Sequence, residues 1–202
     1  MIVIVDYGVG NLSSVHNMLR KAGANVMVSN QPSDILVADK IVLPGVGHFD
    51  YGMKMLNESG LREALDTFVL EMKKPVLGIC LGAQILGKGS EEGNTAGLGW
   101  IDMHCKCIPA TEGLRVPHMG WNKIAIKQQV PLFTHATPDA RYYFVHSYYM
   151  NCMNAEDIAA TAHHGIPFTC AVQRGNIYGT QFHPEKSLRH GLAVMKAFEQ
   201  IA

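Results

Sequence analysis

A five-residue segment near the middle of the chain carries a cysteine between two glycines. It reads Gly78-Ile-Cys80-Leu-Gly82 and joins a short apolar run, residues 75–79, to a helical stretch that begins near Leu81. A nucleophile on a tight strand-to-helix turn needs such neighbours, because larger side chains would clash in the strained backbone. A helix N-terminus behind the thiol also favours the thiolate. The segment therefore predicts a nucleophilic cysteine, although a buried thiol between two turn glycines fits these five residues equally well.

A base for this thiol is available near the C-terminus, in His183-Pro184-Glu185. Residues two apart on an extended segment point to the same side, so His183 can face the thiol while Glu185 orients the imidazole. Nucleophile, base and orienting carboxylate are the three parts of a hydrolytic triad. Because His-Pro is also common in surface turns, the segment predicts a triad only in combination with Cys80.

A glycine-rich turn, Pro44-Gly45-Val46-Gly47, follows another apolar run. Acyl transfer develops negative charge on an oxygen, and the backbone amides of such a turn can stabilise that charge. In open α/β sheets this carboxyl edge is where ligands bind. No Gly-Lys-Ser/Thr follows the turn, so it is not a phosphate loop, and a plain turn is the alternative interpretation.

The elements that must position these residues alternate along the chain. Buried strands are predicted for residues 2–5, 26–28, 40–43 and 75–79, and helices for 12–22, 56–72 and 191–201. Apolar and polar residues alternate over residues 105–108 and 121–126, which is typical of antiparallel strands. The aromatic run 142–149 predicts a core strand with a polar end. We therefore expect an α/β fold in which a mostly parallel, flavodoxin-like central sheet is flanked by helices and extended by antiparallel strands, in one domain over residues 1–202.

The composition argues against several classes of protein. The 17 basic residues balance the 17 acidic ones, so no electrostatic footprint for nucleic acid or an anionic membrane is present. No apolar stretch is long enough for a signal peptide or a membrane span. The five cysteines are irregularly spaced, which predicts reduced thiols in the cytoplasm. The ten histidines lack metal-site spacing, and we expect neither a metal nor a cofactor.

Six segments in order resemble those of class I (triad) glutamine amidotransferases. They are Pro44-Gly-Val-Gly47, Gly78-Ile-Cys-Leu-Gly-Ala-Gln84, Ser90-Glu-Glu-Gly93, Pro117-His-Met-Gly-Trp-Asn122, Tyr143-Phe-Val-His-Ser-Tyr148 and Gln181-Phe-His-Pro-Glu-Lys-Ser187. The segment Gly78–Gly82, which we call the elbow, and the His-Pro-Glu segment are shared by the broad class. Residues 117–122 and 143–148 narrow the resemblance to the glutaminase subunits of imidazole glycerol phosphate synthases. The resemblance extends from the first predicted strand to the last helix.

This resemblance implies a set of roles in the hydrolysis of L-glutamine. Cys80 would attack the side-chain amide and form a thioester, His183 would carry the proton to the leaving ammonia and then activate water, and Glu185 would hold His183. The oxyanion hole would be formed by Gly45, Val46, Gly47 and Leu81. The substrate would be bound by Gln84, Glu92, Ser147 and Tyr148.

The resemblance also implies a partner, a (β/α)8-barrel synthase (cyclase) subunit in a heterodimer. Ammonia would travel through the barrel to a ribulosyl aminoimidazole carboxamide ribonucleotide, giving imidazole glycerol phosphate for histidine biosynthesis and AICAR, a purine precursor. The glutaminase would be nearly idle until the synthase site is filled, and the oxyanion strand would then change conformation. The residues that match the interface segment are His118, Met119, Trp121 and Asn122.

Some positions depart from the family's usual pattern. His48 and Ala83 replace a small residue and a methionine, and the segments 85–89 and 163–165 also differ. None of these touches the triad, but they leave open a paralogous glutaminase that feeds a surface-sugar amidotransferase system. Two alternatives belong to other classes. The intact triad argues against a catalytically silent regulatory module, and the segments 117–122 and 143–148 argue against a free-standing cysteine hydrolase.

Overall fold

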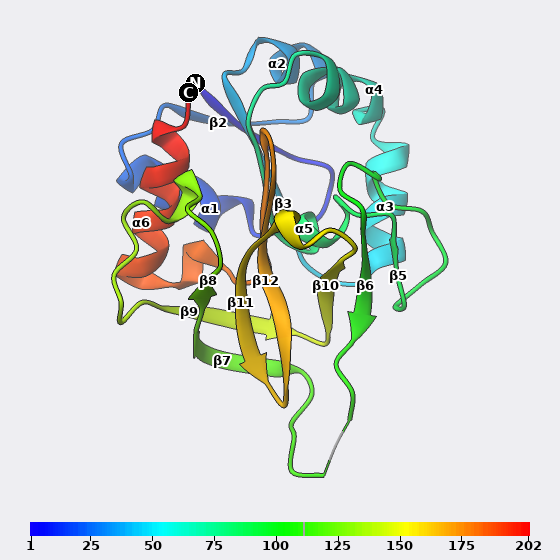
Figure 1. Cartoon of the computed structure of the whole chain (residues 1–202). Helices are drawn as coiled ribbons and strands as arrows, with labels where there is room; N and C mark the ends of the chain where they lie inside the picture. The colour runs from blue at the N-terminus through cyan, green and yellow to red at the C-terminus, as the bar shows by residue number, and fades with distance from the viewer. Residues whose placement is uncertain (111) are drawn as a thin grey trace.

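A computed structural model describes residues 1–110 and 112–202 (Figure 1). Strands and helices alternate through the first half: β1 (Ile2–Val5), α1 (Leu12–Lys21), β2 (Val26–Ser29), α2 (Pro32–Val37), β3 (Lys40–Gly45), α3 (Phe49–Glu58), α4 (Arg62–Asp66), η1 (Thr67–Glu71), β4 (Val76–Cys80) and α5 (Leu81–Gln84). Strands dominate the second half: β5 (Gly89–Ser90), β6 (Met103–Cys107), β7 (His118–Lys123), β8 (Ala125–Ile126), η2 (Pro131–Phe133), β9 (Arg141–His146), β10 (Tyr148–Cys152), η3 (Ala155–Asp157), β11 (Ile158–His164), β12 (Ile166–Arg174), β13 (Ile177–Thr180), η4 (Pro184–Lys186) and α6 (Leu188–Gln200).

Most strands join one sheet, in the order β2-β1-β3-β4-β13-β12-β10-β6-β5, with β11 paired to β12 and β8 paired to β11. The strands β2, β1, β3, β4 and β13 are parallel, while β12 and β10 extend the sheet antiparallel. A separate antiparallel pair, β7 and β9, lies across the lower part of the view in Figure 1. The predicted α/β fold with a mostly parallel centre and added antiparallel strands is confirmed.

The parallel part of the sheet is buried on both faces, because alternate side chains of its strands enter two different cores. In β1, Val3 and Val5 pack into one core, and Ile2 and Ile4 pack into the other. Helices α2, α3 and α4 cover the first core, and α1 and α6 cover the second (Figure 1). Burial of one phenylalanine such as Phe198 contributes about 2–3 kcal/mol. This packing holds the carboxyl ends of β3 and β4 side by side.

The helix predicted over residues 56–72 is confirmed in part. Residues 56–58 end α3, Gly60 with a φ of +74° interrupts the helix, and α4 and the π-helical turn η1 then continue without a gap from Arg62 to Glu71. Leu61, Leu65 and Phe68 are nevertheless fully buried. The apolar spacing thus identified the inward face correctly but not the break.

The aromatic run 142–149, predicted as one core strand, is divided at Ser147 between β9 and β10. β9 pairs with β7 in the small sheet, whereas β10 belongs to the large one. Tyr142 and Phe144 are buried as expected. The last helix, predicted from residue 191, begins earlier at Leu188 and ends at Gln200.

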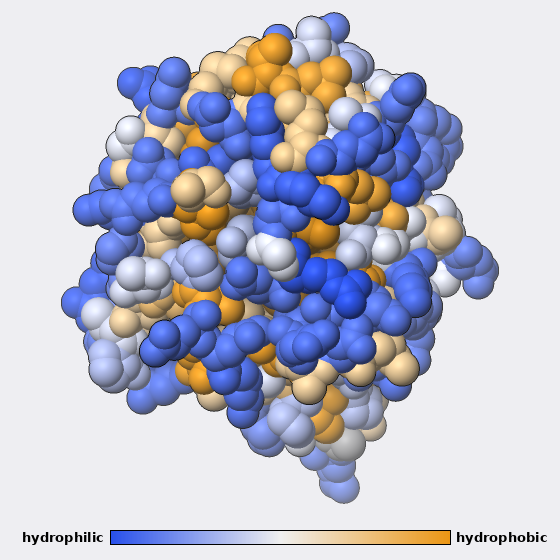
Figure 2. All heavy atoms as spheres, turned by 45° about the horizontal axis from the view of Figure 1, so that its top comes forward, coloured by the Kyte–Doolittle hydropathy of each residue, from blue (hydrophilic) through white to orange (hydrophobic). Residues whose placement is uncertain are grey.

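Polar and apolar side chains are mixed on the surface. On the face seen in Figure 2, apolar atoms form several separate groups among hydrophilic ones. Of the helices in the described part of the chain, none is both long enough and apolar enough to cross a membrane.

Candidate active site

The predicted elbow lies at the carboxyl end of β4. Cys80 has φ 55° and ψ −111°, a conformation that residues other than glycine rarely adopt. A Cβ on Gly78 would lie 2.5 Å from the carbonyl oxygen of Gly82, and a Cβ on Gly82 would overlap the carbonyl of Leu43. Both glycines are therefore required by close backbone packing, as the sequence predicts. The helix behind the thiol, α5, begins at Leu81 as predicted and is a single turn.

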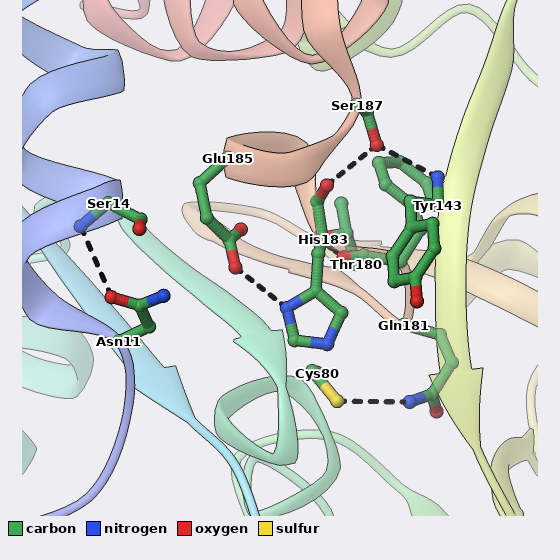
Figure 3. A network of polar contacts seen from close by, with 10 residues as sticks. Asn11, Ser14, Cys80, Tyr143, Thr180, Gln181, His183, Glu185 and Ser187 are labelled. Atoms are coloured by element: carbon green, nitrogen blue, oxygen red, sulfur yellow. Dashed lines mark hydrogen bonds and ion pairs between the residues drawn. The ribbon is translucent and has the colours of Figure 1, made fainter. Parts of the chain in front are cut away.

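The parallel pairing of β13 with β4 brings the C-terminal segment to the same place. Thr180 is opposite Ile79, so the residues after β13 continue past Cys80. His183 Nδ1 lies 2.7 Å from Oε1 of Glu185, and both side chains are buried. Figure 3 shows the imidazole between Glu185 and Cys80, with its other nitrogen on the side of the sulfur. Among the described residues, this buried Nε2 has no hydrogen-bond partner, so it is available to the thiol or a substrate.

The backbone around His183 is fixed by several hydrogen bonds (Figure 3). Its amide donates to the carbonyl of Tyr143 at 2.9 Å, and the Ser187 hydroxyl donates to its carbonyl at 2.6 Å. The same hydroxyl accepts a bond from the Tyr143 amide at 2.9 Å. Glu185 reaches the imidazole from the 3-10 turn η4, not from the extended segment that the sequence predicts. The contact between the two side chains is as expected, but its local geometry is different.

The surroundings of His183 favour the protonated imidazole. Burial alone lowers the pKa of His183, but attraction to the Cys80 sulfur and to the Glu185 carboxylate outweighs burial and raises this pKa to about 10. An imidazole that holds its proton at neutral pH can deliver it to a leaving amine. The three side chains thus have the geometry and electrostatics of an acyl-transfer triad.

A cavity of about 450 Å³ opens beside Cys80. It is lined by Asn11, Val46, Gly47, Cys80, Leu81, Gln84, Glu92, Val145, His146, Ser147, Tyr148, His183 and Lys186. This volume has room for a small polar molecule. The structure therefore brings the predicted nucleophile, the predicted base and all the predicted substrate-binding residues to one cavity.

The four predicted oxyanion residues are not equivalent. Val46, Gly47 and Leu81 line the cavity, but Gly45 is buried in β3, where a Cβ would lie 2.7 Å from the amide nitrogen of Gly82. Gly45 therefore allows β3 to pack against the elbow and does not line the cavity. Gly47 has a φ of +102°, and Val46 is 43% exposed.

The predicted interface residues on β7 divide between its two faces. Met119 and Trp121 are 63% and 45% exposed, whereas His118 is only 4% exposed and Asn122 is half-buried. Strand alternation explains this difference, because successive residues point to opposite sides. The side chain of His118 thus points inward, contrary to its predicted place at a partner surface.

Five residues at the site have no role predicted from the sequence, among them Val145 and His146, which line the cavity. The Nε2 of Gln181 lies 3.8 Å from Cys80 Sγ, and Lys186 lies over the ring of Tyr143, 5.8 Å from its centroid. Asn11 lines the cavity and caps α1 by accepting a hydrogen bond from the Ser14 amide. Gln181 stands two residues before His183, so the period-two argument used for Glu185 could have pointed to it.

Comparisons with known sequences find relatives over the whole chain. The family model described as glutamine amidotransferase class-I matches residues 3–199. A Pseudomonas aeruginosa protein named imidazole glycerol phosphate synthase subunit HisH 2 is 47% identical over 201 residues, which cover 100% of both chains. The imidazole glycerol phosphate synthase subunit HisH of Methanosarcina acetivorans is 48% identical over 203 residues, 99% of this chain and 98% of that protein.

Solved structures agree with the fold. A crystal structure of a glutamine amidotransferase superposes with a TM-score of 0.75 at 17% identity, covering 98% of this chain and 97% of the other. The structure of PurLQS from Thermotoga maritima gives a TM-score of 0.70 at 18% identity, covering 98% of this chain and 94% of the other. At these identities the likeness supports the architecture alone.

Proposed function

We infer that this chain, which belongs to the class I glutamine amidotransferase family, is the glutaminase subunit of an imidazole glycerol phosphate synthase in histidine biosynthesis. In this role it hydrolyses L-glutamine to glutamate and ammonia. The observation that carries the proposal is that Glu185, His183 and Cys80 lie together beside a cavity, in a chain that matches HisH proteins over its full length.

In the proposed reaction, His183 Nε2 accepts and donates the proton in every step. His183 Nε2 holds the thiol proton before the attack, and Cys80 Sγ then attacks the carboxamide carbon of glutamine. The C–N bond then breaks, Nε2 gives its proton to the departing ammonia, and a thioester remains. Nε2 next takes a proton from water as the hydroxide attacks the thioester, and glutamate leaves as the thiol is restored. Glu185 holds the imidazole in the required orientation at 2.7 Å.

Two groups of cavity residues suit this substrate. We assign the oxyanion hole to the backbone amides of Val46, Gly47 and Leu81, which border the cavity next to the sulfur. We assign Glu92 to the α-ammonium group of glutamine, because a carboxylate matches that charge. Glu92 is itself held in place, since its Oε2 accepts a 2.8 Å hydrogen bond from the Phe49 amide. Gln84, Ser147 and Tyr148 supply the remaining polar lining.

The proposed partner is a (β/α)8-barrel synthase subunit that receives the ammonia. Support comes from the HisH relatives, which are named as subunits of a synthase, and from exposed Met119 and Trp121 on β7. Methionine and tryptophan are enriched in interface cores. All five cysteines are free thiols, which suits the reducing cytoplasm that we propose as its location.

The first test is Cys80→Ala in the complex with a barrel synthase subunit. Synthesis of imidazole glycerol phosphate from glutamine should fall by at least about 10³-fold, while synthesis from added ammonia continues. Cys107→Ala, which removes an exposed thiol on β6, is the matched control and should retain activity with glutamine. Retention of glutamine hydrolysis by Cys80→Ala would show that the nucleophile is elsewhere.

The second test addresses the destination of the ammonia. Glutamine hydrolysis is measured for the chain alone, with the barrel subunit, and with the barrel subunit plus its ribonucleotide substrate. We expect the rate to increase at each step. Rapid hydrolysis by the chain alone would contradict the subunit role, and stimulation only by a barrel protein from a surface-sugar pathway would assign the chain to that system.

A further inference from the structure

Buried polar side chains connect strand β7 with the nucleophile. The first three contacts join Asn122 Nδ2 to His118 Nε2 at 3.3 Å, His118 Nδ1 to His146 Nε2 at 2.9 Å, and His146 Nδ1 to the Tyr148 carbonyl at 2.8 Å. The same carbonyl lies 3.0 Å from Gln84 Nε2, which in turn lies 3.1 Å from Gln181 Oε1. The last contact joins Gln181 Nε2 to Cys80 Sγ at 3.8 Å. We name this series the relay. Its segments come from distant parts of the sequence, yet they form one continuous series.

The carbonyl of Tyr148 fixes the direction of every bond between it and β7. A carbonyl oxygen can only accept, so His146 Nδ1 must carry a proton, and because burial keeps this ring neutral its Nε2 must be an acceptor. His118 Nδ1 must therefore donate to that Nε2, which leaves His118 Nε2 to accept from the amide of Asn122. Both neutral imidazoles thus carry the proton on Nδ1.

The same carbonyl fixes the bonds that lead to the thiol. Gln84 must present its NH₂ group to Tyr148, and this group also donates to Oε1 of Gln181. Because Oε1 of Gln181 accepts the hydrogen bond from Gln84, the NH₂ group of Gln181 must face Cys80. The reversed amide would place an oxygen against the sulfur, which would repel a thiolate.

The surroundings of the relay strengthen it. His118, His146, Gln84 and Gln181 are all buried, and hydrogen bonds shielded from water are stronger and more costly to break. Burial is the main cause that lowers the pKa of His146 to about 3 and of His118 to about 4, with nearby histidines adding to it. Both rings are therefore neutral at physiological pH, as the relay requires.

We propose that the relay positions the Gln181 amide so that its N–H faces the sulfur of Cys80 and stabilises the thiolate, with His118, His146 and Gln84 as positioning residues. As a contribution to glutamine hydrolysis, this role rests on the proposed function. The relay begins on β7, the strand that also exposes Met119 and Trp121.

The first experiment uses the unaltered chain. ¹⁵N NMR of the labelled protein at pH 7 reports which ring nitrogen of each histidine is protonated. The relay requires the Nδ1–H form for both His118 and His146, which is the less common form of free histidine. A ring protonated on Nε2 at either position would overturn the proposal.

The second experiment measures the thiol directly, so it needs neither glutamine nor a partner and can fail independently of the proposed function. Alkylation of Cys80 by iodoacetamide at pH 7 is followed by mass spectrometry of its peptide. Gln181→Met keeps the side-chain length but removes the N–H, and should slow alkylation by about tenfold, as expected for a lost hydrogen bond to a charged group. Gln173→Met, on β12, is the matched control and should leave the rate unchanged. An equal rate in Gln181→Met would overturn the proposal.

The third experiment separates the relay from simple packing at one position. In His146→Asn the amide nitrogen can replace Nδ1 and still donate to Tyr148, whereas in His146→Gln the amide lies near the Nε2 position and loses that bond. We expect alkylation of Cys80 within about twofold of the unaltered chain for His146→Asn and a rate close to that of Gln181→Met for His146→Gln. Equal rates in the two variants would contradict the relay.

Discussion

The elbow around Cys80 and the turn around Gly47 are both glycine-containing and lie at the ends of adjacent strands, but they differ in packing. In the elbow, a Cβ on Gly78 would be 2.5 Å from the next turn of backbone, and Gly82 has even less room. At Gly47, of the described residues none comes within 4 Å of the position of a Cβ, and the neighbouring Val46 is 43% exposed. The elbow is therefore closely packed, whereas the turn around Gly47 has free space beside it.

This difference separates two requirements of acyl transfer. The fold itself holds the nucleophile, because the strained conformation of Cys80 is imposed by close packing on both sides. The proposed oxyanion donors at Val46 and Gly47 have space to change conformation. In such an enzyme, activity can be controlled at the turn while the thiol stays in place, which suits the regulated subunit that we propose.

The largest effect should come from closing the elbow further. Gly82→Ala places a methyl group on the carbonyl of Leu43 and forces β3 and β4 apart, so we expect a loss of about 3 kcal/mol or more in the free energy of unfolding. Urea denaturation followed by circular dichroism measures this loss. A variant of unchanged stability would show that the elbow is not locked by its packing.

A smaller effect on the fold but a large effect on catalysis is expected for Glu185→Gln. The carboxylate helps to raise the pKa of His183 to about 10, so its removal should let the ring lose its proton at a lower pH. NMR titration of His183 measures the shift, and kcat for glutamine in the complex should fall by about 10³-fold. A titration that does not move would remove Glu185 from the triad.

The smallest change in stability is expected at the open turn. Gly47→Ala has room for its methyl group but must hold a φ of +102°, so we expect a cost of about 1 kcal/mol together with a clear decrease in kcat. Val46→Ala is the matched control, with a change of at most about 0.5 kcal/mol. If Gly47→Ala lost as much stability as Gly82→Ala, the contrast between the two segments would be wrong.

The sequence predicts best where local pattern and packing agree. The strands of the parallel sheet are recognisable because each is a short apolar run. The elbow is recognisable because its two glycines flank a cysteine directly after such a run, although Gly82 is required by the distant Leu43 carbonyl. The helix predicted over residues 56–72 is interrupted at Gly60, because helical spacing of the apolar residues persists across that break. Periodicity alone does not report such a break.

Site residues were harder to predict when their roles depend on tertiary contacts. Gly45 and Gly47 look alike in the sequence, but only the pairing of β3 with β4 buries the first. The resemblance to the family places His118 in an interface segment, but β7 alternates and its side chain points inward. The orientation of Gln181 depends on a carbonyl of β10, and no local pattern contains that information.

The parallel pairing of β4 with β13 has a consequence for the time at which the enzyme becomes able to react. Cys80 and Gln181 are 101 residues apart in the sequence, and His183 follows β13. During synthesis on the ribosome, the nucleophile and its strand emerge long before the base exists. A nascent or truncated chain that lacks β13 and the segment after it therefore carries the thiol without the means to hydrolyse glutamine, and the supply of that amino acid is protected until the sheet is completed.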